Sequence, residues 1–229
     1  MIRRSFLTLL LATLTPVAGP RHARGEDMNA DWLIAPHHGI GRLTFGLSAD
    51  EVAAFAPVYG EQGSLITYAE KPAAIEEMIA LNRSSLSDET IEILRQSARD
   101  LENRASQNLT KGRVPVLLEY QDNRLDGVAV EAGHTEAHFA GQRVFSLDAR
   151  EVLALFECAN GAPGRYNSTE AAFDNIAVSL FSFSITSPSG KVYPMPRTNP
   201  NFQERSVTVR LAPYRPAHEL DQFVEFSFK

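Results

Sequence analysis

The sequence predicts an α+β protein made of two related units, each a capped helix followed by antiparallel strands. The phrase "FGLSADEVAAF" at residues 45–55 returns as "FSLDAREVLAL" at residues 145–155. After each copy come short runs in which apolar and polar residues alternate, a pattern typical of half-buried strands. A helical stretch over residues 72–108 belongs to the first copy alone, and it predicts a helical-hairpin insertion in that unit.

Each copy of the repeat predicts the start of a helix. Ser48 and Asp148 are strong N-cap residues, and each is followed three positions later by a glutamate, Glu51 or Glu151. This spacing is a capping box, in which side chain and backbone satisfy each other's free hydrogen-bonding groups. We therefore interpret both glutamates as structural rather than catalytic. Two copies of one such unit are expected to pack together, each covering the apolar face of the other.

The first residues have the layout of an export signal. Arg3 and Arg4 precede an apolar run over residues 6–18, which is too short to span a membrane as a helix. Translation from Met1 predicts an exported or periplasmic protein, whereas a start at Met28 predicts a cytoplasmic one. No second apolar run reaches membrane length, so we expect no integral membrane segment in the mature chain. We divide the chain into a signal-like segment at 1–27, a first unit at 28–133 and a second unit at 134–229.

Strands are expected downstream of each helix. The alternating runs lie at 64–68, 114–120 and 127–131 after the first copy, and at 176–186, 206–211 and 222–228 after the second. Residues 121–124, Gln-Asp-Asn-Arg, predict a hairpin turn. The proline-rich segment Pro188 to Pro200 predicts a loop.

The insertion predicts two antiparallel helices. Pro72 opens the first helix, and Ser87 caps the second. The second helix carries a narrow apolar stripe at spacings of three and four, made of Ile91, Leu94, Ala98, Leu101 and Ala105. Two interpretations stay open: the hairpin packs on its own sheet, or it is an arm that faces a partner.

The charge distribution favours a protein partner over a nucleic acid. The chain has a formal net charge of −6, and residues 28–229 hold 18 basic against 26 acidic side chains. Nucleic-acid binding needs a basic face, whereas an acidic surface suits a basic protein partner. The candidate partner-binding residues are the acids expected to be exposed on the insertion: Glu76, Glu77, Asp88 and Glu92.

The sequence offers little catalytic chemistry. Cys158 is the only cysteine, so no intramolecular disulfide can form, and its apolar neighbours predict a buried, inert thiol. His134, Glu136 and His138 are the best enzymatic candidates, but their spacing departs from the zinc-protease pattern. We expect no metal and no cofactor.

The residues of the repeat carry a resemblance. "IAPHHGIGRLTFGLSADEVAAF", at 34–55, and "AGQRVFSLDAREVLAL", at 140–155, resemble bacterial proteins with tandem Gly-Met-Ser/Thr-x-x-Glu-Val repeats. That group includes immunity proteins that neutralise polymorphic toxins. The likeness covers residue 34 to about residue 186, without the helical insertion. A weaker likeness is to the small periplasmic module of the outer-membrane barrel-assembly machinery.

These observations predict a non-catalytic protein-binding module. The resemblance implies an immunity-type protein that occludes a bacterial toxin domain, with specificity supplied by the insertion or by the loop at 188–200. The alternatives are a periplasmic envelope scaffold and an enzyme of unknown type.

Overall fold

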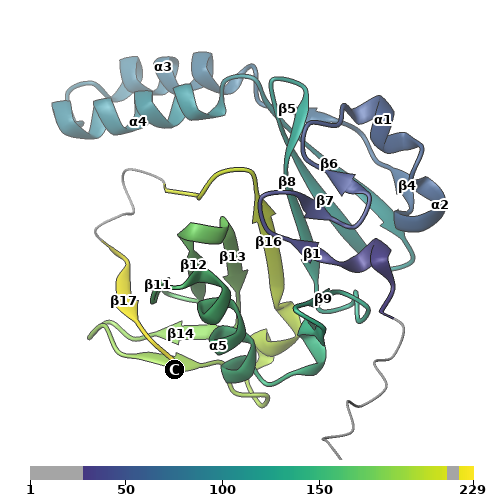
Figure 1. Cartoon of the computed structure of the whole chain (residues 1–229). Helices are drawn as coiled ribbons and strands as arrows, with labels where there is room; N and C mark the ends of the chain where they lie inside the picture. Colours follow the sequence, from purple (N-terminus) through teal and green to yellow (C-terminus); the bar gives the residue numbers. More distant parts are fainter. Residues whose placement is uncertain (1–27, 216–221) are drawn as a thin grey trace, which may run out of the picture.

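A computed structural model describes residues 28–215 and 222–229 (Figure 1). The signal-like segment expected at 1–27 lies outside these residues. The described chain holds five α-helices and only antiparallel pairings between its named strands, so the expectation of a mixed α+β fold is confirmed. None of its helices is long and apolar enough to cross a membrane.

The fold is organised around one ten-stranded sheet with the order β17-β11-β12-β13-β16-β8-β7-β6-β4, in which β5 also pairs with β6. Its strands are β4 (Glu61–Gln62), β5 (Ile66–Thr67), β6 (Arg104–Lys111), β7 (Val114–Gln121), β8 (Arg124–Glu131), β11 (Gly164–Asn167), β12 (Glu170–Phe173), β13 (Val178–Phe181), β16 (Ser206–Arg210) and β17 (Val224–Phe226). Three smaller sheets are formed by β1 (Ile34–Ala35), β2 (Gly39–Ile40) and β3 (Leu43–Thr44), by β9 (His138–Phe139) and β10 (Gln142–Arg143), and by β14 (Ser184–Thr186) and β15 (Val192–Pro194).

The sheet has two parts: strands β4 to β8 form one, and strands β11, β12, β13, β16 and β17 form the other. They meet at β8 and β16, which lie side by side in the middle of the molecule (Figure 1). Their register places Val128 opposite Val209 and Val130 opposite Val207, and all four valines are buried. Buried side chains from both parts form one continuous apolar core. Because sheets are stabilised by such buried cross-strand pairs, the junction joins the two parts into one folded body.

Both predicted capping boxes are present. Ser48 begins α1 (Ala49–Ala53), and Asp148 begins α5 (Ala149–Asn160). The Glu51 carboxylate accepts from the Ser48 N–H at 2.7 Å, and the Glu151 carboxylate accepts from the Asp148 N–H at 2.9 Å. The first helix is short because Pro57 cannot continue it, and a separate turn of helix, α2 (Ala56–Tyr59), follows.

The helical insertion ends earlier than the sequence indicates. Its helices are α3 (Lys71–Asn82) and α4 (Asp88–Leu101), with Ser87 at the N-cap as predicted. Asn103 then adopts a left-handed φ of 59°, which reverses the chain, and β6 starts at Arg104. Ala105, expected on the helical stripe, instead lies in a strand and joins the main core.

Two further segments differ from the expectation. The run at 176–186 splits into β13 and β14, because Ser182 has a left-handed φ of 60° that interrupts the strand. The proline-rich loop contains the short strand β15, which pairs with β14. Val192 of this strand packs into the core, so part of the loop is structural.

The expectation that Cys158 is buried is wrong: its thiol is exposed. The buried face of α5 includes Leu153, Phe156 and Asn160. Cys158 lies two positions after Phe156, about 200° around the helix, and so points away from the core. The buried neighbour is instead Glu157, which is 1% exposed.

Candidate functional site

The helices α3 and α4 form an arm that stands apart from the folded body. They pack extensively against each other, and neither makes a comparable contact with any other described helix or strand. Figure 1 shows the pair projecting beyond the end of the sheet. Ile79, Ile91 and Ala98 are buried within the arm, but they do not belong to the main apolar core. The arm therefore has a small core of its own.

The structure places all four predicted partner-binding acids on this arm, where they are exposed. Three of them are held in ion pairs within the arm. Arg95 donates to both carboxylate oxygens of Glu76, at 2.8 and 3.1 Å. Arg83 contacts Asp88 at 2.8 Å, and Arg99 contacts Glu92 at 2.7 Å. The hydrogen bond from Arg95 lowers the pKa of the Glu76 carboxyl.

Glu77 is the acid of this set that has no ion-pair partner among the described residues. Its carboxylate makes no hydrogen bond or ion pair with any residue in the described part of the chain. Two apolar side chains are also exposed on the arm: Leu81 is 78% exposed and Ile93 is 39% exposed. Sequence reasoning did not single these two out, because it assigned apolar residues of the insertion to a buried stripe.

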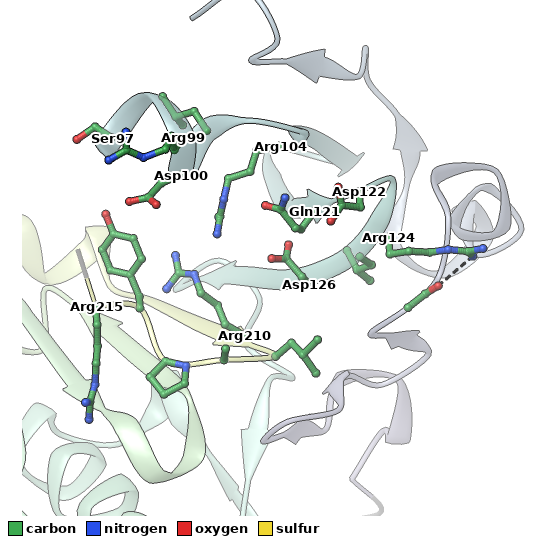
Figure 2. A pocket seen from close by; sticks show the side chains of 17 residues that line it. Ser97, Arg99, Asp100, Arg104, Gln121, Asp122, Arg124, Asp126, Arg210 and Arg215 are labelled. Atoms are coloured by element: carbon green, nitrogen blue, oxygen red, sulfur yellow. Dashed lines mark hydrogen bonds between the residues drawn. The ribbon is translucent and has the colours of Figure 1, made fainter. Parts of the chain in front are cut away.

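A cavity of about 930 Å³ lies at the base of the arm. Its walls are the end of α4, the start of β6, the turn between β7 and β8, and the segment that follows β16 (Figure 2). Five arginines and three aspartates line it: Arg99, Arg104, Arg124, Arg210, Arg215, Asp100, Asp122 and Asp126. Sequence reasoning missed this site. Its signal is the clustering of arginine and aspartate in three segments, 99–104, 121–126 and 210–215, that topology brings together.

The charged groups of the cavity fall into two kinds. Arg210 is held by both oxygens of Glu119, at 2.8 and 3.1 Å, and its guanidinium lies 4.9 Å from the centre of the Tyr214 ring. In contrast, the side chains of Arg104 and Asp126 make no hydrogen bond to another described residue. Burial raises the pKa of the Asp126 carboxyl, against the attraction of Arg104 and Arg210.

The three enzymatic candidates, His134, Glu136 and His138, are each engaged in a different contact, and Glu136 accepts from the Asn29 side-chain amide at 2.9 Å. The His134 ring stacks on Trp32, with the ring centres 4.9 Å apart, and its Nδ1 accepts from the Glu131 N–H at 3.3 Å. His138 is buried in β9, and its Nδ1 faces the carbonyl oxygen of Glu136. The described residues contain no group of three or more His, Cys, Asp or Glu side chains arranged to hold a metal ion.

Comparison with known proteins adds no relative. No protein-family model, no curated protein and no solved structure matches this chain.

Proposed function

We propose that the chain is a non-catalytic protein-binding module of two related α+β units, and that its helical arm docks onto a protein partner. Following the resemblance of the repeat, the partner is a bacterial toxin domain and the protein is of the immunity type. The observation that carries the proposal is the isolation of the arm, which has its own small core and projects from the body (Figure 1).

Local structure supports the relation between the two units. Besides the two capping boxes, each unit has a two-residue hairpin turn that contains one of the matching glycines, Gly41 or Gly141. Gly41 is the first residue of its turn, with a φ of 55°, and Gly141 is the second residue of its turn, with a φ of 76°. Each unit thus enters its helix through a short hairpin. The helical arm is then an insertion into one of two similar units. Such an insertion can supply specificity for a partner without changing the rest of the fold.

The charge of the arm indicates the character of the partner surface. Residues 70–102 hold eight acidic and four basic side chains, a net charge of −4. Complementary charge speeds encounter and excludes wrong partners. Exposed Leu81 and Ile93 add apolar surface, which supplies most of the favourable free energy of association. We therefore expect a partner surface that is basic and carries an apolar patch.

The envelope-scaffold alternative is supported by the edges of the sheet. The sheet ends at β17 on one side, and Phe226 in that strand is 39% exposed. An exposed edge can accept an added strand from another protein. The enzymatic alternative draws little support from His134 and His138, because their rings are engaged by Trp32 and a backbone carbonyl.

The test is capture of the partner from the native organism with C-terminally tagged protein, followed by an activity assay of that partner. An immunity protein should co-purify at one-to-one stoichiometry with a small domain that is toxic when expressed alone and harmless when co-expressed with this chain. Several envelope proteins at low stoichiometry would support the scaffold instead. A captured domain whose toxicity is unaffected by co-expression would refute the immunity proposal.

A further inference from the structure

Two oppositely charged side chains of the cavity, Arg104 and Asp126, each have a buried polar atom without a hydrogen-bond partner. Nε of Arg104 and Oδ1 of Asp126 are buried without a hydrogen-bond partner. The two side chains attract each other electrostatically, yet no nitrogen of Arg104 lies within 4.0 Å of a carboxylate oxygen of any described residue. Figure 2 shows both side chains directed toward the middle of the cavity. A gap therefore separates two opposite charges that share one cavity.

The other arginines of the lining are already engaged. Arg210 is paired with Glu119, and Arg99 with Glu92. Arg215 is paired with Asp174 at 2.6 Å, and Arg124, which points away from the centre of the cavity, is paired with Glu51 at 3.4 Å (Figure 2). Such pairs hold their guanidinium groups in place and cancel most of their charge. Among the arginines that line the described cavity, Arg104 is therefore the one left for a ligand.

A ligand with one sign of charge fits this arrangement poorly. A simple anion that reached Arg104 would also meet the carboxylate of Asp126, and a simple cation that reached Asp126 would meet Arg104. Buried charges are tolerated when each has an opposite partner. A molecule that carries both a carboxylate and an ammonium group would satisfy both residues at once.

We propose that this cavity binds a small zwitterion, a free amino acid or a short peptide, whose carboxylate pairs with Arg104 and whose ammonium group pairs with Asp126. The remaining walls suit an organic side chain, because Leu125, Leu211 and Pro213 also line the cavity. The volume of about 930 Å³ lies within the usual range for small-molecule pockets, about 300–1,000 Å³. This inference does not depend on the identity of the protein partner.

The test is thermal unfolding of the full chain with each of the twenty amino acids and with the dipeptide Ala-Ala, followed by calorimetric titration of the best binder. We expect at least one of these probes to raise the melting temperature and to bind saturably. Blocking either of its charged ends, by N-acetylation or by amidation, should weaken binding at least about tenfold, because a charge-assisted hydrogen bond is lost. Absence of binding by every probe at about 10 mM, or equal binding of the blocked forms, would overturn the proposal.

Variants locate the site. Arg104→Gln and Asp126→Asn should each weaken binding at least about tenfold, while Arg124→Gln, a matched arginine on the same lining, should change it by less than about twofold. Unchanged binding by both Arg104→Gln and Asp126→Asn would overturn the proposal. Circular dichroism checks that each variant is folded. If Arg104→Gln does not fold, Asp126→Asn and the blocked probes still decide.

Discussion

Replacing residues 69–103 by the dipeptide Asn-Gly should remove the arm and leave the rest of the chain folded. The two ends of the arm already meet, because β5 and β6 pair with Thr67 opposite Ala105. The Tyr68 N–H also donates to the carbonyl oxygen of Arg104 at 3.1 Å. A two-residue Asn-Gly turn is well suited to close such an antiparallel pair.

The expected change in the free energy of unfolding is small because two effects oppose each other. Removal of the arm breaks the hydrogen bonds from the Gln121 side chain to the Glu102 carbonyl, at 3.1 Å, and from the Asp122 N–H to the Asn103 carbonyl, at 3.0 Å. Each contributes about 1 kcal/mol. Shortening the connection from about 35 residues to two recovers on the order of 2 kcal/mol of chain entropy. We therefore expect a net change within about 2 kcal/mol, or about 8 °C in melting temperature.

Differential scanning calorimetry and far-ultraviolet circular dichroism measure this outcome. The shortened chain should lose helical signal and keep one cooperative transition. As a control, removal of the β14–β15 hairpin should abolish cooperative folding, because Val192 lies in the main core and Ile185 packs against it. Loss of the cooperative transition in the arm-deleted chain, or a fall of more than about 15 °C, would refute the conclusion that the arm is independent of the body.

Three further predictions concern the body. Gly60→Ala should lower the free energy of unfolding, measured in urea, by about 3 kcal/mol. The reason is that Gly60 has a φ of 109° and an added Cβ would lie 2.1 Å from the carbonyl carbon of Thr110. An unchanged urea midpoint would contradict this. Glu157→Gln should lower the free energy of unfolding by about 1–3 kcal/mol, since the buried carboxylate accepts from the Phe228 N–H at 2.7 Å. Equal stability of the variant and the wild type would show that this contact contributes nothing. Burial lowers the pKa of His134 below its ordinary 6.5, so the unfolded chain binds a proton at this residue more readily than the folded chain does. The free energy of unfolding should therefore fall as the pH drops below about 6.5. His134→Phe should flatten that part of the curve of stability against pH. A wild-type profile that is level between about pH 5 and 7 would remove the basis for this assignment.

The sequence predicts local features well because nearby residues determine them. A capping box needs only residues three positions apart, so Ser48 with Glu51 and Asp148 with Glu151 are recognisable directly. The hairpin turn between β7 and β8 is equally local, and Asp122 and Asn123 adopt the left-handed φ values of 52° and 60° that such a turn needs.

Features that depend on long-range packing are not accessible in this way. The cavity brings together Arg104, Asp126 and Arg210 from three strands, and their proximity follows from the order of strands in the sheet. The exposure of Cys158 depends on which face of α5 meets the core. The apolar residues before Cys158 predict that it is buried, whereas the side chain buried at this end of the helix is that of the charged residue Glu157. The isolation of the arm likewise cannot be derived from its apolar stripe, because a stripe buried against a partner helix resembles one buried against a sheet.

The central claim is that the arm is the surface that binds the protein partner. The most direct measurement is a calorimetric titration of the captured partner into the full chain, the arm-deleted chain, Glu77→Lys and the surface control Glu61→Lys. We predict that deletion of the arm weakens binding at least about 100-fold, that Glu77→Lys weakens binding and reduces its salt dependence, and that Glu61→Lys has little effect. Equal affinity of the full and the arm-deleted chains for the partner would contradict the account.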